Sequence, residues 1–105
     1  MASYEKLVQD GKVAVLVSHG FGAGWYSWNR HNEALVFDRD LVEPILRGDM
    51  NALEAVANSK YPDVHKGGLH DLSVEWVPEG ELFEIEEYDG SESLRIISQQ
   101  QFLRA

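Results

Sequence analysis

The longest apolar run of the chain lies near its N-terminus. Residues 12–18 (KVAVLVS) are apolar almost throughout, without the alternation of a strand that has one face in water. A strand of this kind is typically covered on both sides. We therefore predict a buried and central strand over this segment.

Helical spacing appears in the middle of the chain. Asp38 is a favourable N-cap residue, and Gly48 is a stop signal. Between them the apolar residues recur at helical spacing, at Leu41, Val42, Ile45 and Leu46. A second helix is predicted over residues 50–58, capped by Asp49, whereas residues 32–37 fit neither period.

The last third of the chain alternates with period two. Three strands are predicted from this alternation, over residues 72–77, 82–88 and 93–98. The middle one reads FEIEEY from Phe83, so one of its faces is apolar and the other is acidic. Asp89-Gly90 is a strong turn signal, and it joins the last two strands in a hairpin.

The predicted elements follow the order β-α-α-β-β-β. We expect an α+β fold in a single domain, residues 1–105. Its sheet is mostly antiparallel with about four strands, and the two helices pack on one face. Phe102 and Leu103 are expected to pack against the end of the last strand.

Composition and charge exclude several classes of protein. The chain carries 18 acidic and 9 basic residues, and its net charge of −9 opposes binding to nucleic acid and to anionic membranes. It has no cysteine, which removes disulfides, thiolate metal sites and cysteine nucleophiles. The charged N-terminus does not resemble a signal peptide, and no apolar stretch is long enough to span a bilayer. We therefore expect a cytoplasmic protein.

The acidic residues are unevenly distributed. Residues 67–94 hold nine of the 18 acidic residues and no lysine or arginine. This segment predicts a strongly negative region of the surface. Two interpretations stay open: a solvated sheet face whose charges oppose aggregation, and a binding surface for a basic protein. The candidate partner-binding residues are Glu75, Glu84, Glu86, Asp89 and Glu92.

A glycine-rich segment follows the first strand, with a dense aromatic group directly behind it. Glycine N–H groups can bind an anion, and a tryptophan can stack on a flat ligand. The segment has no G-x-G-x-x-G pattern and no Walker lysine, so a loop that only needs the φ range of glycine is the competing interpretation. At least one tryptophan is expected in the core. The candidate ligand-binding residues are His19, Gly20, Gly22, Gly24, Trp25, Trp28, Asn29 and Arg30.

The sequence contains residue types that occur in active sites, but it contains no catalytic motif. Ser18 and Ser27 lack the G-x-S-x-G context of a serine nucleophile. His65 and His70 match no strong metal motif, so a solvated loop is the favoured interpretation there. No catalytic residue, metal ligand or cofactor is assigned, and binding is favoured over enzymatic activity.

Five stretches are spread in order along the chain: GAGWYSWN from Gly22, LVFD from Leu35, YPD from Tyr61, LSVEWVPEG from Leu72 and FEIEEYDGSES from Phe83. In these stretches the chain resembles a family of small proteins that tailed bacteriophages and some bacteria encode. The resemblance implies a viral or prophage accessory protein that acts in the cytoplasm of a bacterial host. It assigns no role to any residue.

Three functions remain open at this point. The leading hypothesis is a non-catalytic accessory protein of phage type that holds a small, nucleotide-like ligand in the glycine-rich and aromatic loop. The second is an acidic inhibitor of a host protein that acts through residues 71–92. The third is a small hydrolase. The expected partner is a small molecule or a host protein, and the oligomeric state stays open, with a homo-oligomer among the alternatives.

Overall fold

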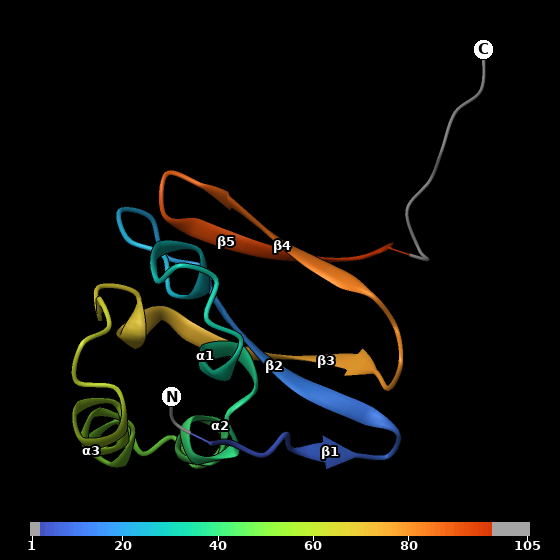
Figure 1. Ribbon diagram of the computed structural model, residues 1–105, viewed down its shortest axis with the longest axis horizontal. Helices are drawn as coiled ribbons and strands as arrows, with labels where there is room; N and C mark the ends of the chain where they lie inside the picture. Colours follow the sequence, from blue (N-terminus) through green and yellow to red (C-terminus); the bar gives the residue numbers. More distant parts are fainter. Residues whose placement is uncertain (1–2, 98–105) are drawn as a thin grey trace.

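The computed structural model describes residues 3–97, and it confirms the α+β class predicted from the sequence (Figure 1). Strands and helices are both short, and the strand pairings are all antiparallel. In chain order the elements are β1 (Val8–Gln9), β2 (Lys12–Ser18), the 3-10 turn η1 (Tyr26–Trp28), α1 (Ala34–Phe37), α2 (Arg39–Arg47), α3 (Met50–Lys60), the 3-10 turn η2 (Leu69–Asp71), β3 (Leu72–Pro78), β4 (Phe83–Tyr88) and β5 (Ser91–Ile96).

Strand β2 is the centre of the fold. It lies between β1 and β3 in a three-stranded antiparallel sheet, with Leu16 opposite Val74. Ala14 and Leu16 point into one core cluster, whereas Val15 and Val17 point into a second cluster on the other face. Both faces of β2 are therefore covered, as its uninterrupted apolar run predicts.

Helix α2 begins and ends where the sequence places it, whereas α3 begins at the predicted residue and continues to Lys60, two residues past its predicted end. The Asp38 carboxylate accepts the N–H of Asp40 at 2.9 Å, and the Asp49 carboxylate accepts that of Ala52 at 3.0 Å. Gly48 ends α2 with a φ of 70°, in the left-handed region that glycine tolerates. The two helices cover one face of the sheet through a buried stripe: Leu41, Val42, Leu53 and Ala57.

Strands β4 and β5 form a separate two-stranded sheet instead of extending the first one. The hairpin lies on the opposite side of β2 and β3 from α2 and α3, so the molecule has three layers (Figure 1). Its inner face packs on the second face of β2 through Phe83, Ile85, Leu94 and Ile96. The expected single sheet of about four strands is divided because the second apolar face of β2 also needs cover.

Two short elements lie outside the sequence prediction. Helix α1 is a single turn, and it contributes Leu35 to the helix-side core and Val36 to the hairpin-side core. Strand β1 has only two residues, too few for a readable period. The predicted packing of Phe102 and Leu103 lies outside the described residues. No helix within residues 3–97 is both long and apolar enough to cross a membrane.

Candidate functional site

The glycine-rich loop and the turn of the hairpin are packed against each other, although 65 residues and more separate them along the chain. The N–H of Gly22 donates to the carbonyl of Asp89 at 2.7 Å, and the Ser91 hydroxyl donates to the carbonyl of His19 at 2.9 Å. The approach is so close that a Cβ at Gly90 would overlap the backbone of residues 22 and 23. The two regions that the sequence marks as separate candidate sites are therefore one structural unit.

The centre of this unit is the carboxylate of Glu92, which is fully buried. It accepts the backbone N–H of Ser18 at 3.0 Å, of Trp25 at 2.9 Å and of Ser27 at 2.8 Å, as well as the Ser27 hydroxyl at 2.6 Å. The prediction that Glu92 belongs to a partner-binding surface is therefore wrong. Four donors offset the loss of water around this charge, and they hold it inside the loop.

The position of Glu92 also changes the interpretation of the glycine-rich loop. N–H groups that converge on one point form an anion site, and a phosphate group would be the expected external ligand. Here the chain's own carboxylate occupies that point, with Trp25 and Ser27 both directed at it. The backbone on both sides of the glycine-rich loop thus uses an anion-binding geometry to hold the hairpin.

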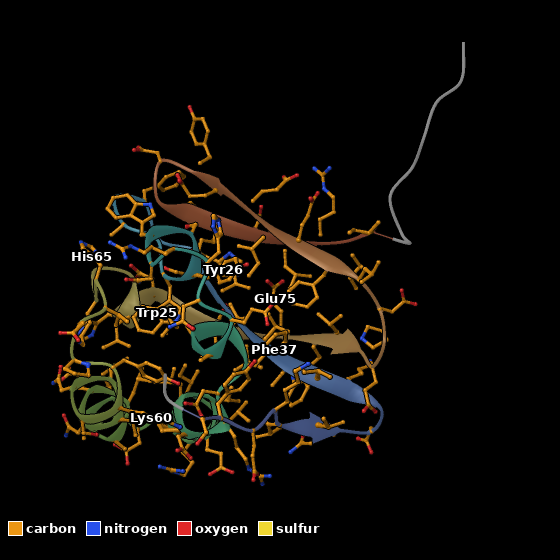
Figure 2. All side chains as sticks on the ribbon, in the orientation of Figure 1. Trp25, Tyr26, Phe37, Lys60, His65 and Glu75 are labelled. Atoms are coloured by element: carbon orange, nitrogen blue, oxygen red, sulfur yellow. The ribbon has the colours of Figure 1, made fainter. Side chains whose placement is uncertain are left out.

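Trp25 belongs to the core and not to an open pocket. Its side chain has no exposed surface, and its indole N–H donates to the carbonyl of Leu35 at 2.8 Å. Figure 2 shows the ring inside the molecule between β3 and α1. The prediction that Trp25 contacts a ligand is wrong, because the one polar group of the ring is satisfied within the fold. The expectation that at least one tryptophan enters the core is confirmed.

The other predicted loop residues are dispersed. Trp28 is 41% exposed and lies against the His65 ring, with the ring centroids 5.3 Å apart. Asn29 fixes the neighbouring loop, because its side-chain nitrogen donates to the carbonyl of His65 and its oxygen accepts the N–H of the same residue. Arg30 is exposed with a φ of 58°. None of four well-formed cavities over residues 3–97 is lined by any of the eight predicted loop residues.

The acidic segment is largely exposed, as expected. Glu84, Glu86 and Asp89 are exposed among the predicted partner-binding residues. Glu75 is only half-buried on β3, 3.8 Å from the Nε2 of His19, and its Oε2 accepts no hydrogen bond from the described residues. Further exposed carboxylates in residues 67–94 belong to Asp71, Glu79, Glu81 and Glu87.

Three large apolar side chains are exposed within this acidic segment or directly beside it. Phe21 is 73% exposed, Leu82 is 71% exposed and Tyr88 is 79% exposed, which makes them the most exposed large apolar residues of the described chain. Phe21 and Tyr88 line one open cavity of about 660 Å³ together with Glu86 and Glu87. None of these three residues is among the candidates predicted from the sequence. The available signal was an aromatic residue at a polar position of an alternating strand, since Tyr88 follows the register of Glu84 and Glu86.

A second, smaller cavity lies between α1 and β4. Its volume is about 190 Å³, and its apolar part comes from Val36, Phe37, Phe83 and Ile85. Tyr26 also lines it, and in Figure 2 this residue lies between the hairpin and the central sheet. Phe37 packs against the same hairpin-side core cluster. Burial raises the pKa of the Tyr26 phenol, and the neighbouring Glu33 carboxylate raises it further.

A partly buried polar cluster joins α2 to α3 at the far side of the molecule. The Asp38 carboxylate accepts the Tyr61 hydroxyl at 2.5 Å and lies 2.7 Å from the Lys60 ammonium. Lys60 also contacts Asp40 at 3.2 Å. Every member has a partner inside the cluster, so its evident role is to hold the two helices together.

The hydroxyl groups of the two candidate serines are both hydrogen-bonded within the fold. The Ser18 hydroxyl donates to the carbonyl of Gly68, and the Ser27 hydroxyl donates to Glu92, so neither is directed at a histidine. Within residues 3–97 no three His, Asp or Glu side chains are arranged to hold a metal ion. No family model matches the chain, and no curated protein or solved structure is significantly similar to it.

Proposed function

We propose that this chain is a non-catalytic accessory protein of phage type that binds a basic protein of the bacterial host. The contact region is the hairpin surface, by which we mean Phe21, Glu84, Glu86, Glu87, Tyr88 and Asp89. One observation carries the proposal: the most exposed aromatic side chains of the described protein lie within its most acidic region.

Aromatic anchors and surrounding charges have different roles in an interface. A buried aromatic ring supplies much of the binding free energy, and exposed apolar groups gathered in one place mark interaction sites. Phe21 and Tyr88 are suited to this role, because most of their surface is in contact with water in the free protein. The carboxylates around them attract a positively charged partner and speed its association.

The competing functions have less support in the geometry. A nucleotide-like ligand would need backbone N–H groups at the glycine-rich loop, but Glu92 accepts those of Ser18, Trp25 and Ser27 on either side of it. The N–H of Gly22 donates to the carbonyl of Asp89. Such a ligand would also need Trp25, which is sealed in the core. A serine hydrolase would need a hydroxyl directed at a base, and the hydroxyls of Ser18 and Ser27 are engaged elsewhere.

The phage context rests on the sequence resemblance, which places the partner in a bacterial cytoplasm. The net charge of −9 is consistent with a basic protein as the partner and opposes a nucleic acid in that role. A small protein that covers a basic face of a host protein would inhibit whatever that face contacts.

The proposal is tested by capturing a partner from a bacterial lysate on the immobilised protein, purifying that partner and measuring its dissociation constant. We expect Phe21→Ala and Tyr88→Ala each to weaken binding by about tenfold or more. Trp28→Ala is the matched control, because Trp28 is a partly exposed aromatic residue outside the hairpin surface. It should change the affinity by less than about twofold.

Charge is tested separately with the same purified partner. The double variant Glu86→Lys/Asp89→Lys should abolish most of the affinity, whereas Asp63→Lys, on the loop after α3, places a positive charge away from the hairpin and should have little effect. Binding should also weaken between about 50 mM and about 500 mM salt. A partner that binds equally well at both salt concentrations, or equally well to Tyr88→Ala, would refute the proposal.

A further inference from the structure

The cavity between α1 and β4 is lined by both aromatic rings and carboxylates. Its floor is apolar and aromatic, and it includes Phe37 and Phe83, whose ring centroids lie 5.9 Å apart at an angle of 82°. Three carboxylates also line it, from Glu33 before α1 and from Glu81 and Glu84 at β4, together with Tyr26 and Leu82. An aromatic floor with carboxylates around it favours an organic cation.

The volume of the cavity limits the size of the ligand that it can hold. Pockets for whole cofactors and drug-sized molecules are typically about 300–1,000 Å³, whereas this one measures about 190 Å³. It suits a single side chain and not a nucleotide. The cavity also lies directly beside the hairpin surface, because its lining includes Glu84 of β4. A partner that covers the hairpin can therefore reach it.

One ring of this aromatic group, Phe37, already contacts a cation of the protein, although that cation does not line the cavity. The Lys6 ammonium lies 4.3 Å from the centroid of the Phe37 ring, within the range of a cation–π contact. A guanidinium group is better suited than an ammonium group to the open side of the cavity. It is planar, it is weakly hydrated, it stacks on aromatic rings, and it donates two parallel hydrogen bonds to a carboxylate.

From these contacts we infer that the cavity formed by Tyr26, Glu33, Phe37 and Phe83 is a binding site for an arginine side chain of the partner protein. The inference rests on the proposed function, since it names the residue of the basic partner that enters the protein. The arginine aliphatic stem lies on Val36 and Ile85, and its guanidinium group pairs with Glu33 and the hairpin carboxylates.

The test uses N-acetyl-arginine N-methylamide as the probe and follows the NMR signals of the labelled full-length protein. N-acetyl-citrulline N-methylamide is the matched control, because it has nearly the same shape and no charge. We expect the arginine probe to shift the signals of Val36, Phe83 and Ile85 in a saturable way, and the citrulline probe to leave them unchanged. The corresponding lysine amide should bind more weakly than the arginine amide.

Two variants locate the site. Glu33→Gln removes a carboxylate that lines the cavity and should weaken arginine binding by about fivefold. Glu54→Gln removes the same charge from α3, on the opposite side of the central sheet, and it should change the affinity by less than about twofold. Equal shifts with citrulline, tighter binding of lysine, or an equal loss in both variants would overturn the inference.

The result can be separated from the test of the proposed function. If Tyr88→Ala releases the captured partner while Glu33→Gln still binds it fully, the hairpin surface stands and the arginine site fails. If the arginine probe binds in the cavity but no basic protein depends on Tyr88, the proposed function fails and the cavity remains a site for an organic cation alone.

Discussion

The carboxylate of Glu92 lies 2.9 Å from the backbone nitrogen of Trp25, 67 residues earlier in the chain, and neither side chain is exposed. This contact fixes the hairpin to the loop that follows β2. It brings the exposed Phe21 next to Tyr88, since the backbone of Gly22 is hydrogen-bonded to the hairpin turn. The hairpin surface therefore depends on a buried charge that the surface itself does not display.

Replacing Glu92 by glutamine should destabilise the fold strongly. The amide group directs a donor at N–H groups that need an acceptor, so we expect Glu92→Gln to lower the free energy of unfolding by about 3 kcal/mol. The control is Glu86→Gln in the same hairpin, where only an exposed ion pair with Arg95 is lost. It should cost at most about 1 kcal/mol. Denaturant unfolding followed by circular dichroism gives both values, and equal values would contradict the role assigned to Glu92.

Two glycines with nearly the same backbone angle give a second prediction. Gly90 has a φ of 87° and Gly80 has a φ of 86°, but only at Gly90 would a Cβ overlap the neighbouring loop. Gly80→Ala should lower the free energy of unfolding by about 1 kcal/mol through backbone strain alone. Gly90→Ala should lower it by several kcal/mol, because the hairpin turn must move away from the loop. Similar melting temperatures for the two variants would show that the contact is not tight.

The two tryptophans beside the loop should differ in their effect on stability. Trp25→Ala removes a fully buried ring and should lower the free energy of unfolding by about 3–5 kcal/mol. Trp28→Ala removes a ring that is 41% exposed, and it should cost about 1 kcal/mol or less. Thermal unfolding of both variants and of the unmodified protein measures the two losses of stability. A larger loss for Trp28→Ala would mean that the core is assigned to the wrong tryptophan.

Alkaline pH should weaken the cluster that joins α2 to α3. Burial and then the hydrogen bond to Asp38 raise the pKa of the Tyr61 phenol. Burial lowers the pKa of the Lys60 ammonium, but the hydrogen bonds to Asp38 and Asp40 outweigh it and raise that pKa overall. Both groups hold their protons more firmly in the folded state. The stability that they provide is therefore complete below about pH 10, and it is lost as the pH rises through the folded-state pKa values.

Tyr61→Phe tests this pH dependence directly. At about pH 8 the variant should be less stable than the unmodified protein by about 1–2 kcal/mol, because one buried hydrogen bond is lost. The difference in the free energy of unfolding should shrink as the pH rises above about 10, since the unmodified protein then loses the same contribution. Denaturant unfolding at several pH values measures this difference. A constant difference across that range would contradict the assignment.

Much of the fold follows from patterns that are local in the sequence. The apolar run of residues 12–18 requires cover on both sides, and β2 has it. Asp38, Gly48 and Asp49 act as the caps that their residue types predict, since each capping hydrogen bond joins residues at most four apart. Strand alternation from Phe83 onwards likewise assigns the inner and outer faces of the hairpin.

Only the tertiary structure decided which groups pack against those faces. Glu92 resembles its exposed neighbours in the sequence, and it is buried because donors from residues 18–27 converge on it. Trp25 and Trp28 are the same type of residue. Only the position of α1 against the sheet places Trp25 in the core and leaves Trp28 at the surface. Composition and periodicity specify which side chains avoid water, because those preferences act along a few residues. The pairing of groups 50 to 74 residues apart depends on how the layers pack, which no local pattern encodes.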